Sequence, residues 1–342
     1  MEKRKLASIQ YIHHIEPIED ADRIELVKVL GWQCVANKGQ FQVGDLCVYM
    51  EVDSYLPICE RFEFLRASSY KNTELMGEGF RLKTMRFRGQ ISQGLVQPLS
   101  ILPLGDYRIG DDVTEILEIR KWEVEERVTT SGRQLGLFPD GITKTDELRV
   151  QSYPELIEEF QAAGEYYIST KMDGTSVTMY LRGGHFGVCG RNFEYVDDEK
   201  CAMWRYAHEH QIEENLIAHG YDNVAIQGEY CGAGIQKNRL KLVKPQWYVF
   251  TVINLTTGRR YDLKEMQVLC DLVGLNIVPI EEIKEQFPYQ TVEELLERAK
   301  GKYTSGANKE GIVIRPTKGV YSQTLRGPLS MKVLNNEYLL KE

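Results

Sequence analysis

The first hundred residues show strand-like runs and almost no helical periodicity, and this pattern restricts the fold more than any other feature of the chain. β-rich runs lie at residues 6–12, 24–29, 46–52 and 91–96, and they are separated by Gly and Asp turns such as Gly44-Asp45. Short strands with little helix between them predict a small β-barrel in this part of the chain.

The composition changes near residue 125, where polar, turn-rich segments follow the predicted barrel. Thr129-Thr130-Ser131-Gly132 and Phe138-Pro139-Asp140-Gly141 form this connection. We therefore expect two domains, residues 1–125 and residues 126–342. A barrel of the OB type fits the length of the first domain and leaves a face that can hold nucleic acid, although a structural or oligomer-forming barrel fits the same pattern.

The second domain mixes helical and strand patterns. Apolar residues recur at helical spacing over residues 197–219 and over 262–273, and Thr291-Val292-Glu293-Glu294 has the pattern of a capping box. Because the intervening strands do not alternate regularly with helices, we expect an α+β domain with antiparallel sheets. These strands are predicted at residues 167–171, 177–181, 224–229, 247–253 and 311–315.

Composition and cysteine spacing exclude several classes of protein. No signal-peptide pattern and no apolar run of membrane-spanning length occurs, so we expect a cytoplasmic protein that does not bind a membrane. The seven cysteines include no C-x-x-C pair. This spacing disfavours a zinc or redox site and favours buried free thiols.

The net charge of −8 argues against non-specific coating of nucleic acid but leaves room for a local basic groove. Two clusters of cations are candidates for such a groove, and an ordinary solvated surface is the alternative for each. The clusters are Arg81, Lys83, Arg86 and Arg88, and Lys237, Arg239, Lys241 and Lys244.

Lys171-Met172-Asp173-Gly174 is the segment with most chemical interest, but alone it fits a strand that runs into an Asp-Gly turn. Its meaning depends on the segments that follow it, which are Gly190-Arg191-Asn192, residues 228–237, Tyr248-Val249-Phe250, residues 310–315 and Ser330-Met331-Lys332-Val333. In this order the six segments resemble the motifs of covalent nucleotidyltransferases, the ATP-dependent polynucleotide ligases and capping enzymes.

Within that superfamily, residues 228–237 resemble RNA ligases of the phage nick-sealing type, and the layout is similar to that of Deinococcus-type RNA ligases with an N-terminal OB domain. The resemblance implies an OB-like nucleic-acid-binding barrel followed by an adenylyltransferase domain with antiparallel sheets. It also implies an ATP-dependent RNA ligase that seals 3′-hydroxyl and 5′-phosphate breaks, in nicked duplexes, through lysyl-AMP and AMP-capped 5′ ends. The alternatives are a capping-type or other nucleotidyltransferase, a DNA-acting ligase, and a non-catalytic RNA-binding protein.

Lys171 is the expected nucleophile. A lysine attacks the α-phosphorus of ATP only as the neutral amine, so its pKa must fall from about 10.4. Nearby positive charge lowers the pKa of a lysine, and we expect Lys332, Arg191 or Arg315, together with a divalent cation, to supply it.

The remaining roles follow from the chemistry of Mg²⁺ and from the resemblance. Mg²⁺ or Mn²⁺ needs only one or two protein oxygens, and Asp173 and Glu310 are the candidate ligands. The resemblance assigns Glu229 to the ribose, Arg191 to ribose and phosphate, Phe250 to adenine stacking and Lys332 to the α-phosphate. Asp173, Gly174 and Glu310 are also expected to line the nucleotide site. Each of these assignments competes with a purely structural role. Phe250, for example, could fill a core position, and Arg191 could pair with Glu194.

A segment shortly before the nucleophile offers further candidates. Deinococcus-type enzymes have a similar segment there, so Lys144, Arg149 and Gln151 are candidates for reaching the nucleotide phosphates. The pairs His13-His14 and His208-x-His210 lack the spacing of a closed metal site and are expected to be surface residues.

One departure from the superfamily pattern concerns the last motif. Many members carry two lysines separated by one residue, whereas Lys332 is followed here by Val333 and Leu334. Arg326 or Lys318 is the candidate to replace the missing second lysine.

Because the chain ends at Glu342, without a second OB domain after the last motif, an RNA ligase is favoured over DNA ligases and capping enzymes. We expect a monomer whose partner is RNA or an RNA-containing nicked duplex.

Overall fold

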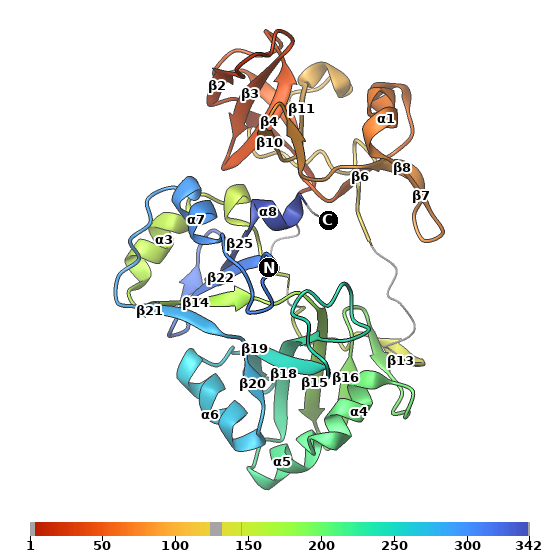
Figure 1. Ribbon diagram of the computed structural model, residues 1–342, viewed down its shortest axis with the longest axis vertical. Coiled ribbons are helices and arrows are strands. Elements are labelled where there is room, and N and C mark those ends of the chain that lie inside the picture. Colours follow the sequence, from red (N-terminus) through yellow and green to blue (C-terminus); the bar gives the residue numbers. More distant parts are fainter. Residues whose placement is uncertain (1–3, 124–131, 145, 341–342) are drawn as a thin grey trace. The chain divides into compact units, whose positions relative to one another are not determined.

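The computed structural model describes residues 4–123, 132–144 and 146–340, and its elements carry the labels of Figure 1. The chain divides into two compact units. The first holds residues 4–123 together with Val150–Pro154 and residues 339–340, and the second holds residues 132–144, 146–149 and Glu155–Tyr338. The expected boundary at residue 125 and the segment Thr129 to Ser131 lie outside the described residues.

The first unit consists mainly of short strands. These are β1 (Ala7–Tyr11), β2 (His14–Pro17), β3 (Ile24–Val29), β4 (Trp32–Asn37), β5 (Leu46–Met50), β6 (Ser54–Leu56), β7 (Tyr70–Thr73), β8 (Gly77–Arg81), β9 (Met85–Phe87), β10 (Gln90–Ser92), β11 (Leu95–Pro98) and β12 (Arg120–Lys121). Helix α1 (Arg66–Ser69) and the 3-10 helices Glu60–Leu65, Leu99–Ile101 and Val150–Ser152 are short. The sheets have the strand orders β1-β5-β11, β2-β3-β4, β12-β6-β8-β7 and β10-β9.

Strand β5 separates two hydrophobic cores of this unit. Val48 and Met50 belong to one core, whereas Cys47 and Tyr49 belong to the other. Successive side chains of a strand point to opposite faces, so β5 is buried on both sides. This double burial explains why its sequence reads as a continuous apolar run.

The strand predicted at residues 91–96 forms two strands instead of one. β10 ends at Ser92 and β11 begins at Leu95, so Gln93 and Gly94 interrupt the run. Gly94 has a φ of 102°, a conformation that side-chain-bearing residues rarely adopt. The turn at Gly94 therefore ends one strand before the next begins.

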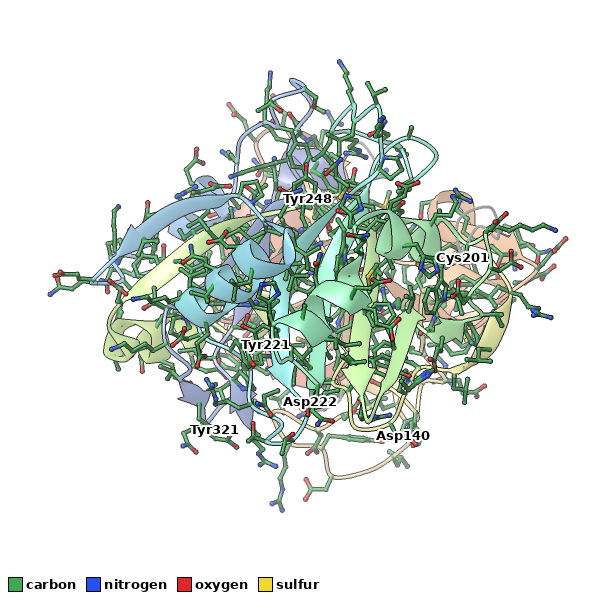
Figure 2. The ribbon with its side chains drawn as sticks, turned by 90° about the horizontal axis from the view of Figure 1, so that it is seen from below. Asp140, Cys201, Tyr221, Asp222, Tyr248 and Tyr321 are labelled. Carbon is green, nitrogen blue, oxygen red and sulfur yellow. The ribbon has the colours of Figure 1, made fainter. Side chains whose placement is uncertain are left out.

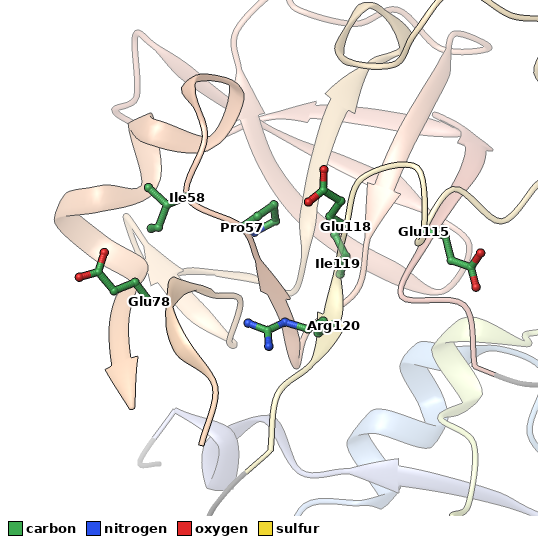
Figure 3. Close-up of a pocket in the computed structure, with 7 residues that line it drawn as sticks. All are labelled: Pro57, Ile58, Glu78, Glu115, Glu118, Ile119 and Arg120. Atoms are coloured by element: carbon green, nitrogen blue, oxygen red, sulfur yellow. The ribbon is translucent and has the colours of Figure 1, made fainter. Parts of the chain in front are cut away.

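A cavity of about 660 Å³ opens on the first unit (Figure 3). Its lining includes three carboxylates, Glu78, Glu115 and Glu118, and one cation, Arg120. Excess negative charge disfavours a phosphate-bearing ligand there. None of the predicted site residues lines this cavity.

The second unit is built from two large sheets, one two-stranded sheet and six helices among the described residues. Its strands are β13 (Gln134–Leu137), β14 (Tyr166–Lys171), β15 (Thr175–Arg182), β16 (His185–Cys189), β17 (Phe193–Tyr195), β18 (Asn223–Cys231), β19 (Gln246–Asn254), β20 (Asn276–Ile277), β21 (Ile280–Lys284), β22 (Gly311–Pro316) and β25 (Met331–Leu334), with the small pair β23 (Tyr321–Ser322) and β24 (Gly327–Pro328). Its helices are α3 (Leu156–Ala163), α4 (Ala202–Glu209), α5 (Ile212–Ala218), α6 (Leu263–Val273), α7 (Val292–Arg298) and α8 (Asn336–Leu339).

The larger sheet has seven strands in the order β13-β17-β16-β15-β18-β19-β20, and the smaller has four in the order β21-β14-β22-β25. Only the pair β19–β20 is parallel among the described pairs of these sheets. Helices α4, α5 and α6 bury their apolar residues against the larger sheet, and Figure 2 shows Tyr221 and Asp222 in the turn that follows α5. The α+β architecture with antiparallel sheets agrees with the sequence prediction.

The helical pattern of residues 197–219 is split into α4 and α5. Gln211 between them has a φ of 49°, in the left-handed region, which interrupts the helical hydrogen bonds. The helices predicted at residues 262–273 and after Thr291 are present as α6 and α7. Asp262 forms a capping box at the start of α6, and Thr291 forms one at the start of α7. No helix in the described ranges is long and apolar enough to cross a membrane.

We predict that Gly94→Ala destabilises the first unit more than Gly39→Ala does. Both glycines have positive φ, so each alanine costs about 1 kcal/mol in backbone strain. A Cβ at Gly94 would also lie 2.6 Å from the Met50 carbonyl oxygen, whereas Gly39 has no atom within 4 Å. Overpacking should raise the cost at Gly94 to roughly 2–4 kcal/mol, measured by denaturant unfolding. Equal losses in the two variants would contradict this account.

Candidate active site

Lys171-Met172-Asp173-Gly174 lies where the chain crosses from one sheet to the other. Lys171 is the last residue of β14 in the four-stranded sheet, and β15 of the seven-stranded sheet begins at Thr175. Met172 packs in a small buried cluster with Cys231 and Val278. A Cβ at Gly174 would lie only 2.4 Å from the Tyr230 carbonyl oxygen, so the crossing requires a glycine there.

Glu310 lies directly beside the candidate nucleophile. Lys171 is the register partner of Gly311 in the antiparallel pair β14–β22, and the Lys171 Nζ to Glu310 Oε1 distance is 2.8 Å. The buried hydroxyl of Tyr303 donates a hydrogen bond to the Lys171 carbonyl oxygen at 2.7 Å and accepts one from the Glu310 N–H at 3.0 Å. Tyr303 thereby links the main chains of the two charged residues.

The charges around Lys171 differ from the sequence prediction. Burial lowers the pKa of Lys171, but the carboxylates of Glu310, Glu229 and Asp173 outweigh it and hold the pKa above the ordinary value. Burial raises the pKa of Glu229 to about 7, with a further contribution from the neighbouring carboxylates. The amine is thus held as an ammonium by acidic neighbours, and the expected cationic neighbours lie elsewhere.

Asp173 is almost completely buried and has two contacts from distant segments. Its Oδ1 accepts a hydrogen bond from the Tyr338 hydroxyl at 3.0 Å, and the Arg239 Nε lies 3.4 Å from its Oδ2. Arg239 was predicted as part of a basic groove, but only 13% of its side chain is exposed. Arg239 is therefore committed to Asp173 and does not belong to a solvated basic surface.

The acidic residues fit a hard divalent cation. Asp173 Oδ2 is buried without a hydrogen bond, and burial and the nearby charge of Glu310 raise the pKa of Asp173. The described residues contain no group of three or more His, Cys, Asp or Glu side chains arranged as a closed metal site. Mg²⁺ and Mn²⁺ need fewer protein ligands than that, so Asp173 and Glu310 stay the candidate ligands.

Lys332 and Arg149 are neighbours on the same sheet. Lys332 is paired with Val313 in β22, and its N–H donates to the Leu148 carbonyl oxygen at 2.8 Å. Arg149 forms an isolated parallel bridge with Lys332. Since directly paired residues share a face of a sheet, Lys332 and Lys171 lie on the same face, two strands apart.

Glu229 and Phe250 lie on the larger sheet. Glu229 is opposite Tyr248 in the pair β18–β19, and Phe250 occupies a bulge where the register shifts. Phe250 is half-buried and packs against the cluster that contains Met172. Its ring is thus only partly buried, whereas a core position would require full burial.

Arg315 is bound inside the unit, on the same sheet face as Lys171 but at the other end of the β14–β22 pair, opposite Tyr167. It donates to Glu147 and to the Phe250 carbonyl oxygen, and also to Thr251 Oγ1 at 3.0 Å and Ser330 Oγ at 3.1 Å. Its guanidinium therefore orients the strand that carries Phe250.

Arg191 is half-exposed in the turn between β16 and β17. Its Nη2 lies 3.1 Å from Asp146 Oδ1, whereas Glu194 accepts hydrogen bonds from Tyr180 and from His185. The alternative pairing of Arg191 with Glu194 is therefore wrong. The nearby Lys144 donates to the Asn192 side chain at 3.2 Å.

The other candidates have different contacts or are exposed. Gln151 belongs to the first unit, where its carbonyl oxygen accepts from Gly31 N–H at 2.9 Å. His208 contacts Asp197, and His210 stacks on Tyr206, so neither takes part in a closed metal site. Lys318 and Arg326 are exposed, and Lys318 lines a cavity of about 50 Å³ with Phe250 and Arg315.

Three contributors were missed at the sequence level, namely Glu147, Tyr303 and Tyr338, and Arg239 was assigned to a basic groove instead of to Asp173. Each acts through a contact with a residue far away in the sequence, and none belongs to a short motif that names its partner. The only available signals were Glu147 between Asp146 and Arg149, and Tyr338 shortly after the final motif.

Comparisons with known proteins agree with this geometry. A family model described as RNA ligase matches residues 164–333, and one described as an OB-fold domain matches residues 6–99. The latter match confirms the prediction of an OB-type barrel. The comparison with curated proteins found no match.

The chain is similar to solved structures of the Naegleria gruberi RNA ligase. A variant with ATP and Mn is 35% identical, with a TM-score of 0.90 and 99% of each chain covered. A variant with AMP and Mn is 36% identical, with a TM-score of 0.91 and the same coverage. The structure with PPi is 36% identical, with a TM-score of 0.88 and 99% of each chain covered.

The buried pair of Glu147 and Arg315 predicts a pH-dependent loss of stability. Burial would raise the pKa of Glu147, but Arg315 and Arg260 outweigh it and lower the pKa from 4.5 to about 2. Because the folded-state pKa is depressed, this stabilisation is full above pH 4.5 and is lost as the pH falls toward 2. At neutral pH Glu147→Gln should therefore lower the free energy of unfolding by about 3 kcal/mol.

The control is Glu63→Gln, which removes an exposed Arg66–Glu63 pair and should change stability little. The measurement is denaturant unfolding between pH 3 and pH 7. A constant difference between wild type and Glu147→Gln across that range would show that the carboxylate charge contributes nothing.

Proposed function

This chain belongs to the RNA ligase family, and we propose that it joins a 3′-hydroxyl to a 5′-phosphate in RNA, with ATP as co-substrate and Lys171 as nucleophile. The observation that carries the proposal is the Lys171–Glu310 pair at the sheet crossing, surrounded by Asp173 and Glu229. The similarity to ligase structures with ATP, AMP and PPi supports the nucleotide.

In the first step, the Lys171 amine attacks the α-phosphorus of ATP. A nitrogen–phosphorus bond forms, the bond to the bridging oxygen breaks, and pyrophosphate leaves with lysyl-AMP remaining. Glu310 Oε1, 2.8 Å from Nζ, is within reach to accept the ammonium proton. A divalent cation supplies positive charge beside the carboxylates, which favours the neutral amine and stabilises the phosphate charge.

The surrounding residues are proposed to orient the nucleotide. Phe250 has a partly exposed ring for stacking on adenine, and Glu229 on the same sheet has a carboxylate for the ribose hydroxyls. Lys332 and its neighbour Arg149 offer cations to the phosphates, so Arg149 supplies the second charge that the last motif lacks. Arg191 would exchange Asp146 for the nucleotide.

Two further steps complete the ligation in the same site. AMP passes from Lys171 to the 5′-phosphate end, and the 3′-hydroxyl then attacks that phosphate and releases AMP. Both transfers build negative charge on the oxygens of the reacting phosphate, which the same cations stabilise. We propose a nick in a duplex as the preferred break because residues 228–237 resemble nick-sealing ligases.

We expect Lys171→Ala to abolish the acid-labile adenylate that forms with α-labelled ATP, because the substitution removes the amine that is paired with Glu310. Lys264→Ala, which removes an exposed lysine of the same unit, should label like the wild type. Persistent labelling of Lys171→Ala would refute the nucleophile assignment. Preferential labelling by GTP would favour a capping-type enzyme, and no labelling of the wild type would favour a non-catalytic binder.

The β9–β10 hairpin of the first unit is the proposed RNA contact of the OB-type barrel. Arg86 in β9 and Arg88 in the turn are exposed on either side of Phe87, whose exposed fraction is 37%. Within the described residues, neither arginine forms an ion pair or a hydrogen bond. Arg81 from the same predicted cluster instead stacks on Trp122, with 4.8 Å from its Cζ to the ring centroid.

The double variant Arg86→Ala/Arg88→Ala should seal nicked RNA more slowly while its lysyl-AMP forms at the wild-type rate. Each lost phosphate contact should reduce the slope of log affinity for RNA against log salt concentration by roughly one. The matched control, Lys71→Ala/Arg108→Ala, removes the same charge from exposed positions of the same unit. Equal sealing by both double variants would exclude the hairpin as the contact.

A further inference from the structure

The last helix of the second unit is attached to the segment that carries Glu310. Asn335 is buried, and its N–H donates to the Glu310 carbonyl oxygen at 2.9 Å. Its side-chain amide donates to the Lys309 carbonyl oxygen at 3.1 Å, and its Oδ1 accepts from the Glu337 N–H at 3.0 Å. Asn335 therefore fixes the start of α8 beside one candidate metal ligand.

Three residues later, Tyr338 reaches the other candidate ligand. Its hydroxyl donates to Asp173 Oδ1 at 3.0 Å, and both residues are at least 95% buried. Arg239 lies over the Tyr338 ring, with 4.0 Å from its Cζ to the ring centroid, while its Nε approaches Asp173 Oδ2. The hydroxyl, the guanidinium and the carboxylate thus form one closed cluster.

We propose that Tyr338 is a positioning residue of the catalytic site, whose hydroxyl sets the orientation of the Asp173 carboxylate beside Lys171. This inference rests on the proposed function of Lys171 and Asp173. Tyr338 acts through Asp173. With Oδ1 held by the hydroxyl, Oδ2 is the oxygen that remains directed to a cation, and Arg239 offsets its charge until a cation binds.

The physical basis is the loss of rotational freedom of a buried carboxylate. A carboxylate without a fixed donor can rotate about its last side-chain bond, and the time that it spends in the productive orientation falls. Donors to metal-binding carboxylates typically contribute a factor of roughly 10 to 100 in metal affinity or in activity. An effect through Asp173 should therefore appear in cation binding and in the maximal rate.

The test is Tyr338→Phe, which removes the hydroxyl but retains the ring on which Arg239 lies. The matched control is Tyr166→Phe, because the buried Tyr166 donates to a different carboxylate, Glu282, at 2.6 Å. Lysyl-AMP formation is measured against ATP concentration. We expect Tyr338→Phe to lower the maximal rate roughly 10- to 100-fold with an unchanged KM for ATP, and Tyr166→Phe to change neither.

A second readout is independent of catalysis. Binding of Mn²⁺ to each variant is measured in the presence of AMP by the electron paramagnetic resonance signal of free Mn²⁺. We expect the affinity of Tyr338→Phe for Mn²⁺ to fall roughly tenfold or more, with that of Tyr166→Phe unchanged. Thermal unfolding of both variants identifies any general loss of stability.

Wild-type values in both assays for Tyr338→Phe, or equal losses in the two variants, would overturn the positioning role. Labelling that persists in Lys171→Ala would instead refute the proposed nucleophile. In that case the Mn²⁺ measurement would still decide whether Tyr338 orients Asp173, so the two failures are distinguishable.

Discussion

The antiparallel register of β14 and β22 is the constraint on which the site depends. It places Lys171 opposite Gly311, so that Glu310 lies next to the amine at 2.8 Å. A Cβ at Gly311 would lie 2.1 Å from the Val333 carbonyl oxygen, so a glycine allows β22 and β25 to approach closely. A slip by one residue would turn Lys171 to the other face and separate it from Glu310.

Charge at this site is organised in two opposed groups. Carboxylates surround Lys171 and keep its pKa high, whereas cations such as Lys332 and Arg149 lie together two strands away. In the proposed mechanism, the Lys171 amine stays protonated in these acidic surroundings until a divalent cation brings positive charge to the carboxylates. Activation of the proposed nucleophile would therefore depend on binding of the cation that accompanies the nucleotide.

Most of the fold and the principal motif residues could be predicted from the sequence, and the contacts between them could not. Strand periodicity predicted β3 with its bounds, and the capping boxes at Asp262 and Thr291 were readable as local patterns. The splits at Gly94 and Gln211 were missed because a single residue with positive φ leaves hydrophobic periodicity unchanged. At Gln211, a non-glycine residue, the local pattern also carries no information on the backbone angle.

The sequence by itself determined the types and the order of the proposed site residues, from Lys171 to Lys332, because these lie in short motifs read along the chain. Only the tertiary structure decided that the neighbours of Lys171 are acidic, that Arg315 is bound by Glu147, and that Tyr338 holds Asp173. The physical reason is distance along the chain. Electrostatic and hydrogen-bond energies depend on separation in space, and two residues 165 positions apart in the sequence, such as Asp173 and Tyr338, are brought together only by the tertiary fold.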